Sequence, residues 1–341
     1  MPWSPKGKYI WDFWFASRDG ETHIFYLQGE TGGLPSDPEV LKDRSSIGHA
    51  ILGKFGWREV SCEPALSAST ANGAWDNLSL WTGSIFHDPE SALYYMFYTG
   101  RSKDTPRLWT PSEWQHPQQI GVATSRDLLR WQRLASCLDA PLIANPGTTN
   151  GFDGVAWRDP FVVHLDGNYY CFVSSRLVPG SIHESVHIES FDEGGCIAYL
   201  VSPDLRSWNE SSIEILIASK DFYQMEVPQV FWRTSGDTRV LYLIFCAQEK
   251  DCSIHRRKSQ PESQNRTGIF YMRSDPVPAD LPGLPPLTEP ARLLVEGLYA
   301  GRILDPDGDR LWLFGFPFDT GGLAEPVELA FDGIDLVMAE S

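Results

Sequence analysis

Short apolar segments separated by polar turns recur along the whole chain, a pattern typical of β-strands. Five of these segments are rich in aromatic residues and resemble one another: 23–28, 93–100, 169–175, 242–248 and 310–316. Aligning one phenylalanine in each, at positions 25, 97, 172, 245 and 314, gives intervals of 72, 75, 73 and 69 residues (97−25, 172−97, 245−172, 314−245). The pattern therefore predicts five repeats of nearly equal length.

Each repeat contains further strands around its aromatic segment. An apolar strand and a turn such as Asp166-Gly167 precede it, as in a β-hairpin. In the first four repeats a third strand follows, at residues 46–52, 119–125, 196–202 and 268–274, and two of these lead through an Asp-Leu turn to a tryptophan that begins a fourth. We therefore predict an all-β fold, a five-bladed β-propeller with four antiparallel strands per blade, in which residues 1–341 form a single domain.

The long connections all follow the second strand of a repeat, at residues 29–45, 101–118, 176–195 and 249–267. In a propeller these connections lie on one face, which we call the top face, and the short turns lie on the opposite face. Long loops over a rigid scaffold commonly carry binding sites. We therefore expect the functional site on the top face.

Carboxylates occur at equivalent positions of the innermost strands. Asp12 and Asp159 each lie 13 residues before the aligned phenylalanine of their repeat (25−12 and 172−159), as do Ser84 and Gly301 (97−84 and 314−301). Glu226 lies 19 residues before its aligned phenylalanine (245−226), and we attribute the difference to a longer turn in that repeat. The counts predict that the three carboxylates face one another at the top of a central funnel.

Three converging carboxylates suggest acid/base chemistry on a sugar. Glycosidases use one protonated and one ionised carboxyl group around an oxocarbenium-like centre, and aromatic rings offer a surface for the apolar faces of sugars. The tryptophans expected in the funnel are Trp11, Trp81 and Trp157. Structural interpretations stay open for each carboxylate: Asp12 as a strand cap, Asp159 in an ion pair with Arg158, and Glu226 as a surface residue.

The charge of the chain narrows its range of partners. The 341 residues carry a formal net charge of −17, with a pI of about 4.8, so we expect neither nucleic acid nor a membrane as a partner. The N-terminal aromatic run contains Asp12 and lacks a cleavage site of small residues, and no apolar run is long enough to span a bilayer. The six cysteines form no CxxC pair. These features favour a cytoplasmic protein without a signal peptide.

The short motifs around the candidate residues resemble those of the fructofuranosidase and fructosyltransferase clan, glycoside hydrolase families 32 and 68 with the related family 43. The motifs are WD at 11–12, IGHA at 47–50, WTGS at 81–84, WRDP at 157–160, MEVP at 225–228 and LYAGRILDPDG at 298–308. The resemblance extends over nearly the whole chain. Its most specific part is the Arg-Asp-Pro followed later by Glu-x-Pro.

The resemblance implies roles for the three carboxylates. It implies that Asp12 is the nucleophile that attacks the anomeric carbon, that Asp159 binds ring hydroxyls and stabilises the transition state, and that Glu226 acts as acid and then base. With the funnel tryptophans included, the candidate sugar-binding residues are Trp11, Trp81, Ser84, Trp157, Arg158, Gln229 and Tyr299.

Three departures separate the chain from the usual family 32 pattern. Trp11-Asp12-Phe13 stands where family 32 usually has Asn-Asp-Pro, and is closer to family 68. Gln229 stands where family 32 has an acid after Glu-Cys-Pro. Only 27 residues follow Phe314 (341−314), so we expect no C-terminal β-sandwich.

Residues 183–187 read His-Glu-Ser-Val-His and match the HExxH pattern of zinc peptidases. That pattern requires a helix that places both histidines on one face, but here it lies in a connection between two predicted strands. We interpret His183 and His187 as solvated loop residues, with a loop metal site or a substrate contact at the rim as alternatives. Trp109 and Trp114, in another long loop, are candidate platforms for outer sugar units.

We therefore expect a glycosidase that hydrolyses a β-fructofuranoside such as sucrose or a short fructan, or transfers its fructosyl group, by a retaining double displacement without a metal or other cofactor. Its expected partner is a small carbohydrate substrate, and the sequence gives no indication of an oligomeric state. Two alternatives stay open: a family 43-like α-L-arabinofuranosidase or β-xylosidase, and a propeller that binds sugar or protein without catalysis.

Overall fold

The chain forms five β-sheets that follow one another around a common centre. The computed structural model describes residues 2–31, 38–111, 114–183 and 186–339. The first two sheets consist of β1 (Lys8–Arg18), β2 (Glu21–Glu30), β3 (Ser46–Gly53) and β4 (Gly56–Glu59), and of β5 (Ser79–Asp88), β6 (Leu93–Arg101), β9 (Gln118–Ser125) and β10 (Gln132–Arg133). The third consists of β11 (Phe152–Leu165), β12 (Asn168–Leu177), β15 (Gly195–Ser202) and β16 (Glu214–Ala218).

The last two sheets complete the ring. The fourth consists of β17 (Glu226–Ser235), β18 (Thr238–Ala247), β19 (Gly268–Ser274) and β21 (Leu287–Glu296), with the short strand β20 (Val277–Pro278) paired to β18. The fifth consists of β22 (Leu298–Ile303), β23 (Leu311–Pro317), β24 (Val327–Asp332) and β25 (Asp335–Met338). Neighbouring strands are antiparallel, which confirms the predicted five-bladed propeller.

Helices and short hairpins occur only in the connections of the described residues. The α-helices are α1 (Pro38–Lys42) and α2 (Ile254–Ser259), and the 3₁₀ helices are Ala135–Cys137, Thr148–Asn150, Glu210–Ser212, Glu249–Asp251 and Glu262–Gln264. Two hairpins rise from the second and third blades: β7 (Leu108–Trp109) with β8 (Trp114–Gln115), and β13 (Ile182–His183) with β14 (Val186–His187). None of the described helices is long and apolar enough to cross a bilayer.

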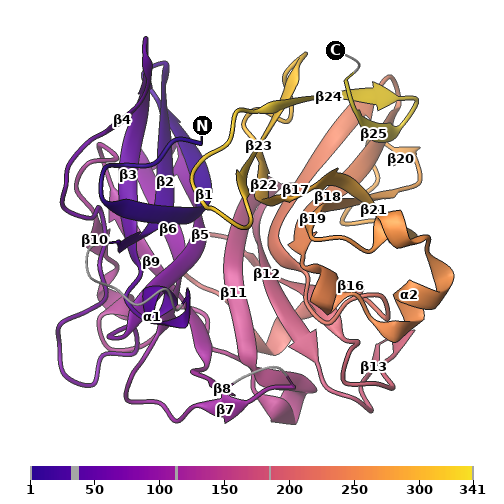
Figure 1. Cartoon of the computed structure of the whole chain (residues 1–341), viewed down its shortest axis with the longest axis horizontal. Coiled ribbons are helices and arrows are strands. Elements are labelled where there is room, and N and C mark those ends of the chain that lie inside the picture. The colour runs from indigo at the N-terminus through magenta and orange to yellow at the C-terminus, as the bar shows by residue number, and fades with distance from the viewer. Residues whose placement is uncertain (1, 32–37, 112–113, 184–185, 340–341) are drawn as a thin grey trace.

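The ring closes where the first and last blades meet. In Figure 1 the chain runs from the indigo sheet on the left through the magenta and orange sheets to the yellow fifth blade, which returns beside β1. Trp3 and Leu323 exchange two backbone hydrogen bonds of 2.7 Å, and the amide of Gly322 donates to the carbonyl of Ile10 at 2.9 Å. Each blade is therefore built from contiguous sequence, and backbone hydrogen bonds join the two ends of the ring.

The core lies between adjacent blades. One cluster of buried side chains joins blades 1 and 2 around Trp14 and Phe25, and another joins blades 2 and 3 around Phe97 and Trp157. The aromatic residues of the second strands supply much of this interface, so the repeat visible in the sequence is the repeat of the interblade packing. Burial of these faces fixes the strands as a rigid scaffold for the loops above them.

The fourth blade has longer strands, not a longer turn. Ser235 pairs with Thr238, so its turn has two residues, like the turn at Asp19-Gly20. From the turn to the aligned phenylalanine, the second strand spans 7 residues in blade 4 (245−238) but 4 in blade 1 (25−21). The greater separation of Glu226 from its aligned phenylalanine therefore comes from extra strand pairs, and the expected longer turn is wrong.

Candidate active site

All five innermost strands carry a β-bulge near their top end. In blade 1 the pairing shifts between Ile10 and Phe13, and corresponding shifts occur at 81–83, 158–161, 226–229 and 299–302. A bulge re-aims the side chains of the bulged strand. The backbone at three of these bulges is left-handed, with φ of 59° at Asp159, 55° at Val227 and 53° at Ala300. Such values are uncommon for residues other than glycine, and here they accompany the turn of side chains toward the propeller axis.

The strand pairing defines which residues share the level of these bulges. Trp14 pairs with Phe25, and Asp12 lies two residues before Trp14. The same rule gives Thr82, Asp159 and Ala300 in blades 2, 3 and 5. In blade 4 it gives Glu226 when the pairing of Gln229 with Ile244 is continued by one residue to the level of Phe245. The three carboxylates therefore share one level. Ser84 and Gly301 do not, because longer connections to the second strand shift the count in blades 2 and 5.

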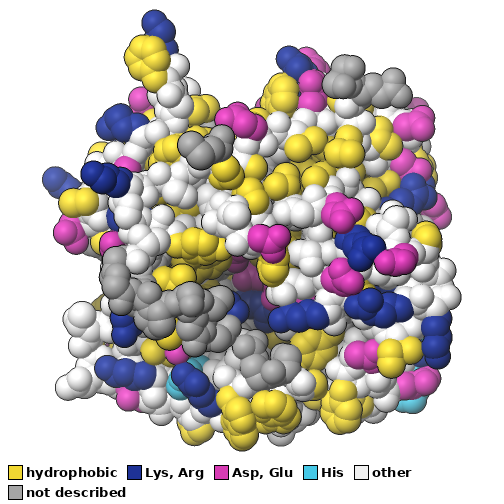
Figure 2. Space-filling model, in the orientation of Figure 1, with side chains coloured by type: hydrophobic (Ala, Val, Ile, Leu, Met, Phe, Trp, Pro, Cys, Tyr) yellow, Lys and Arg dark blue, Asp and Glu magenta, His cyan; other side chains and the backbone are white. Residues whose placement is uncertain are grey.

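A cavity of about 660 Å³ opens on the top face above this level. Figure 2 shows its opening in the middle of the molecule, with acidic and basic side chains visible inside. Of the residues predicted for the site, those that line the cavity are Trp11, Asp12, Trp81, Arg158, Asp159, Glu226 and Tyr299. Leu41, Lys42, Gln115 and Lys250 line it from the long connections that were predicted for the top face.

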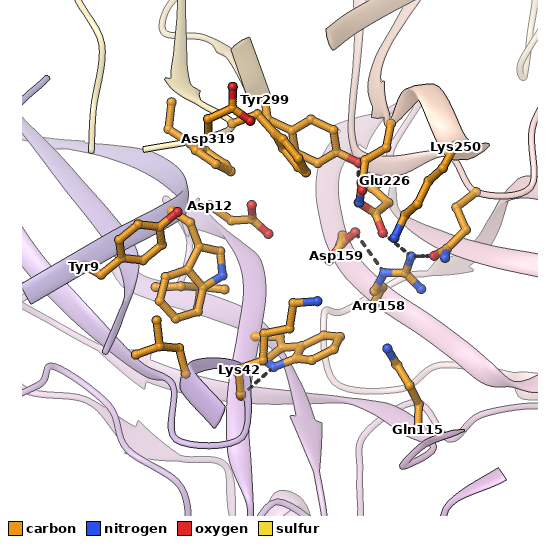
Figure 3. A pocket seen from close by; sticks show the side chains of 18 residues that line it. Tyr9, Asp12, Lys42, Gln115, Arg158, Asp159, Glu226, Lys250, Tyr299 and Asp319 are labelled. Carbon is orange, nitrogen blue, oxygen red and sulfur yellow. Dashed lines mark hydrogen bonds and ion pairs between the residues drawn. The ribbon is translucent and has the colours of Figure 1, made fainter. Parts of the chain in front are cut away.

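Arg158 connects two of the carboxylates (Figure 3). Its Nη2 lies 2.6 Å from Oε1 of Glu226, and its Nε lies 3.6 Å from Oδ2 of Asp159. It also donates to the side-chain oxygen of Gln224. The hydroxyl of Tyr299 donates to Oε2 of Glu226 at 2.5 Å. Both oxygens of Glu226 are therefore held by donors.

The two aspartates have fewer donors. Oδ2 of Asp159 accepts the backbone amide of Val227 at 2.9 Å, which ties the bulge of β11 to that of β17. Asp12 accepts the hydroxyl of Thr82. Figure 3 shows the Asp12 carboxylate directed into the cavity, across from Asp159 and Glu226.

These surroundings separate the three carboxyl groups electrostatically. Burial, reinforced by the charge of Asp159, raises the pKa of Asp12 to about 7. Burial also raises the pKa of Asp159 to about 6, although Arg158 opposes it. Burial acts in the same direction on Glu226, but Arg158 and the Tyr299 hydroxyl outweigh it and hold the pKa of Glu226 below its usual value. Of the three carboxyl groups, Glu226 is thus the most acidic and Asp12 the least.

The cavity has one wall of mostly apolar rings. Its members are Tyr9, Trp11, Leu27, Leu41, Phe316 and Phe318, from blades 1 and 5 and the connections above them. Trp81 lines the cavity from blade 2, where its Nε1 donates to the carbonyl of Lys42 at 3.0 Å. The guanidinium of Arg101 lies 4.0 Å from the centre of the Trp81 ring. Both contacts fix the orientation of an indole that suits the C–H face of a sugar.

The other wall is polar and was not predicted. It contains Lys42, Gln115, Gln224, Gln248 and Lys250. Three of these five, Lys42, Gln115 and Lys250, lie in the long connections that the repeat pattern placed on the top face. Gln248 directly precedes one of those connections, and Gln224 directly precedes the MEVP motif. Their location in those segments was the available signal, but loop composition does not reveal which side chains turn inward. Amides and ammonium groups make this wall suitable for hydroxyl-rich or anionic groups.

Three predicted sugar-binding residues lie outside the cavity. Ser84 is buried and its hydroxyl accepts the amide of Val162 at 3.2 Å. Trp157 is fully buried in the interface between blades 2 and 3. Gln229 exchanges hydrogen bonds of 2.9 and 2.7 Å with the backbone of Ile303. All three side chains support the scaffold and do not line the cavity. The structure therefore corrects the prediction that they contact the sugar directly.

The HExxH segment forms a hairpin and not a helix. Ile182 pairs with His187 and His183 pairs with Val186, while residues 184–185 lie outside the described residues. The two histidines therefore sit on separate strands, without the helical spacing of a zinc peptidase. Among the described residues no group of three His, Cys, Asp or Glu side chains could hold a metal ion.

The tryptophans of the β7–β8 hairpin do not line the cavity. Trp109 pairs with Trp114, and each side chain is 60% exposed. Leu108 pairs with Gln115, which does line the cavity. Because side chains alternate along a strand, the two tryptophans project from the opposite face of the hairpin. Their assignment as sugar platforms therefore has no support from the lining of the cavity.

Comparison with known families identifies the chain. Residues 61–277, more than half of its length, match the family described as "Glycosyl hydrolases family 32 N-terminal domain". The chain belongs to glycoside hydrolase family 32. The matched region contains Asp159 and Glu226 of this family 32 chain, whereas Asp12 precedes it. No curated protein matches the sequence.

Solved structures share the fold of this family 32 chain. The GH32 β-fructofuranosidase of Bombyx mori is 16% identical with a TM-score of 0.62, and the match covers 98% of this chain and 64% of that one. The sucrose-6-phosphate hydrolase of Lactobacillus gasseri is 18% identical (TM-score 0.64; 97% and 62% covered), and the levansucrase of Bacillus subtilis is 14% identical (TM-score 0.65; 98% and 87% covered). The chain thus spans less than two thirds of the length of the first two, and these likenesses establish the fold.

Proposed function

We propose that this chain is a retaining β-fructofuranosidase that acts on sucrose or short fructans, with fructosyl transfer as a second outcome of the same reaction. The observation that carries the proposal is the placement of Asp12, Asp159 and Glu226 at one level of three blades, on the floor of a cavity with an aromatic wall. Membership of family 32 supports it, as do neighbours in fold that are named as a β-fructofuranosidase and a levansucrase.

Each carboxylate receives a role in two steps. In the first, Asp12 attacks the anomeric carbon while Glu226 donates its proton to the leaving-group oxygen, which leaves a fructosyl ester on Asp12. In the second, Glu226 removes a proton from water, or from an acceptor hydroxyl, as that oxygen displaces Asp12. Asp159 binds ring hydroxyls and stabilises the positive charge of the transition state.

Substrate binding has to change the protonation of Asp12 and Glu226. Attack requires an ionised Asp12 and a protonated Glu226, but burial raises the pKa of Asp12 to about 7 and Arg158 holds that of Glu226 below its usual value. Sugar hydroxyls that donate to Asp12 favour its ionised form. A leaving group that draws Arg158 away from Glu226 removes the contact that keeps Glu226 ionised. We therefore propose that the substrate itself sets the reactive protonation state.

The polar wall favours a second candidate substrate class. Lys42, Lys250 and Arg158 bring three cationic side chains to the cavity of a chain whose net charge is −17. Ammonium and guanidinium groups bind phosphate esters well. A phosphorylated fructoside such as sucrose 6-phosphate is therefore a second candidate. A family 43-like pentosidase and a non-catalytic propeller remain the alternatives that the test has to exclude.

The decisive experiment measures sugar release by the full chain. Sucrose, sucrose 6-phosphate, a short fructan and an aryl α-L-arabinofuranoside are incubated with the wild type, Asp12→Asn and Glu226→Gln. Asp307→Asn, an exposed acid in the bottom turn between β22 and β23, is the matched control. We expect fructose to be released by the wild type and the control, together with glucose 6-phosphate where sucrose 6-phosphate is the substrate, and a loss of about 10³-fold or more in both site variants.

Other outcomes would redirect the proposal. Arabinose release that depends on both residues would replace the fructosidase with a pentosidase. Absence of any turnover, with sugar binding preserved in both variants, would support a binding module. Nuclear magnetic resonance of the released fructose, recorded before mutarotation, tests the configuration of the product. β-Fructose as the first product indicates retention.

A further inference from the structure

Arg302 is buried beneath the level of the carboxylates. It lies on β22, opposite Phe314 and two residues beyond Ala300, which is the blade-5 residue at the carboxylate level. Only 2% of its surface is exposed. No sequence argument singled it out, because it reads as one polar residue within the strand LYAGRI.

Its hydrogen bonds leave the charge without a carboxylate partner in direct contact. Nη1 donates to the carbonyls of Val227 and Pro228 at 2.9 and 2.7 Å. Nε and Nη2 make no hydrogen bond to any described residue. The guanidinium carbon lies 5.4 Å from the centre of the Phe161 ring. A buried guanidinium bound only to carbonyls is costly unless nearby charges compensate it.

Asp12 and Asp159 supply that compensation. Burial lowers the pKa of Arg302 to about 10, while the charges of Cys246, Asp159 and Asp12 act in the opposite direction. The effect is mutual, since Arg302 lowers the pKa of both aspartates. Arg158, the cation on the cavity side, is already held by Glu226 and Gln224. Arg302 thus provides positive charge to the aspartates from below.

We propose that Arg302 is a positioning residue of the proposed fructosidase reaction: its buried charge keeps Asp12 ionised for attack, and its Nη1 fixes the bulge of β17 that presents Glu226. This inference rests on the proposed function. Val227 and Pro228, whose carbonyls Arg302 binds, directly follow Glu226 in the chain. One side chain therefore contacts the strand that carries the acid and also interacts electrostatically with the nucleophile.

The groups whose charges act on Arg302 are Asp12 on β1, Asp159 on β11 and Cys246 on β18. Glu226 on β17 directly precedes the two residues whose carbonyls Arg302 binds, and Arg158 and Tyr299 contact Glu226 in turn. The first three groups are acids that gain from a nearby cation. Removing Arg302 therefore favours protonation of the acids, and Asp12, with its already raised pKa, is the most affected at neutral pH.

The test is the pH dependence of kcat, which reports the carboxyl groups of the substrate complex, for the fructoside that the wild type hydrolyses; it is measured for the wild type, Arg302→Met, Arg302→Gln and Arg302→Lys. We expect the acid limb, where Asp12 loses activity by protonation, to move up by about one pH unit in the two uncharged variants. Activity at a pH below the limb then falls about tenfold. Arg302→Lys keeps the charge and is expected to restore the wild-type limb within about 0.3 unit.

A matched control separates charge from packing. Gln229→Met removes the neutral side chain that joins β17 to β22 through Ile303, next to the contacts of Arg302. It is expected to lower the thermal midpoint of unfolding without moving the acid limb. An Arg302→Met variant that folds and keeps the wild-type limb would overturn the inference.

A second measurement covers variants that do not turn over substrate. Thermal unfolding of Asp12→Asn, Arg302→Met and the double variant forms a double-mutant cycle. If the positive charge of Arg302 compensates the negative charge of Asp12, then Asp12→Asn stabilises the Arg302→Met variant by more than it stabilises the wild type. Additive effects would contradict the proposed placement of charge. Because the cycle needs no substrate, it remains informative even if the proposed fructosidase activity fails.

Discussion

The hydroxyl of Thr82 donates a hydrogen bond to Oδ2 of Asp12, so the residue that blade 2 places at the carboxylate level contacts the carboxylate of blade 1 directly. This contact opposes the effect of burial on Asp12. Burial and Asp159 raise the pKa of Asp12 to about 7, whereas the Thr82 hydroxyl lowers it. Thr82 therefore helps to keep the proposed nucleophile ionised.

Replacing Thr82 with valine removes this donor while keeping the side-chain shape. The pKa of Asp12 is expected to rise further, because the hydrogen bond favours the ionised form. The acid limb of kcat, which reports the substrate complex, then moves to higher pH by roughly half to one unit. Thr238→Val, at a bottom turn where the hydroxyl donates to the carbonyl of Ser235, is the control and leaves the limb in place. An unmoved acid limb in Thr82→Val would exclude Asp12 as the group that titrates there.

Tyr299 acts on the other side of the reaction. Its hydroxyl donates to Oε2 of Glu226 and lowers the pKa of that acid. Tyr299→Phe is therefore expected to raise the pKa of Glu226. Since the acid works only while protonated, the basic limb of the pH profile of kcat moves to higher pH. The maximum value of kcat falls because Glu226 is less well oriented. Tyr271→Phe, whose hydroxyl accepts from Arg292 outside the cavity, serves as the comparison. A basic limb that stays fixed would separate Glu226 from the acid role.

The sequence predicted the scaffold well because the blades repeat a strong signal. The third strands expected at 46–52, 119–125, 196–202 and 268–274 appear as Ser46–Gly53, Gln118–Ser125, Gly195–Ser202 and Gly268–Ser274. Aromatic residues at fixed intervals pack the interfaces between blades, so the spacing along the chain records the packing in space. The same regularity placed Asp12 and Asp159 at one level.

Residue counting failed where backbone irregularity changes which side chains face inward. In β1 the bulge spans Trp11 and Asp12, and both line the cavity. In β11 one register shift ends before Trp157 and the next comes after Arg158, so Trp157 and Arg158 still alternate. Arg158 therefore faces the cavity and Trp157 the interface between blades. Neither bulge is visible in the spacing of apolar residues.

The polar wall was beyond prediction for a different reason. Lys42 reaches the cavity because its segment is anchored by contacts that are distant in sequence, such as Arg101 with Asp43, 58 residues apart. A loop's sequence does not specify such anchors. What the sequence does establish is that these loops lie on the same face as the carboxylates.

The anchor at Asp43 gives a prediction about binding. Its carboxylate accepts Nη2 of Arg101 at 2.6 Å and Nη2 of Arg107 at 3.1 Å, which fastens the segment carrying Leu41 and Lys42 to blade 2. Asp43→Asn weakens both ion pairs, and a loss of roughly 1 kcal/mol in the ordering of that segment corresponds to about a three- to tenfold rise in KM. We expect kcat to change by less than about twofold, because the carboxylates are not touched.

A surface ion pair provides the control for Asp43. Glu328→Gln breaks a bidentate contact with Arg310 on the outer part of blade 5, away from the cavity. It is expected to leave both kinetic constants unchanged. A fall in kcat at constant KM in Asp43→Asn would show that the segment acts on the chemical step and not on binding.

A buried pair of histidines in blade 1 predicts acid sensitivity of the fold. Nδ1 of His23 lies 2.8 Å from Nε2 of His49, and the His49 ring stacks on Phe25 with centroids 4.2 Å apart. Burial lowers the pKa of both, that of His49 to about 3 with a further contribution from His23. The folded chain therefore keeps His49 neutral at pH values where the unfolded chain is protonated.

The sign of the pH effect follows from this difference. Stability supplied by neutral His49 is complete above the unfolded pKa of about 6.5 and is lost as pH falls from there toward about 3. At pH 5 the loss is roughly 2 kcal/mol for one histidine that stays neutral. Asp12 and Asp159 act in the opposite direction, because acids with a raised pKa bind protons in the folded state. A comparison of two proteins that both contain them cancels their effect.

The measurement is urea unfolding of the wild type and His49→Phe at pH 7.5 and pH 5.0. Phenylalanine keeps the stack on Phe25 but does not take up a proton, so His49→Phe is expected to lose about 2 kcal/mol less than the wild type on acidification. His164→Phe, at an exposed position, controls for the loss of a histidine as such. If His49→Phe and the wild type lose equal stability between the two pH values, the His23–His49 pair is protonated in the folded chain without cost, and the acid sensitivity has to come from other groups.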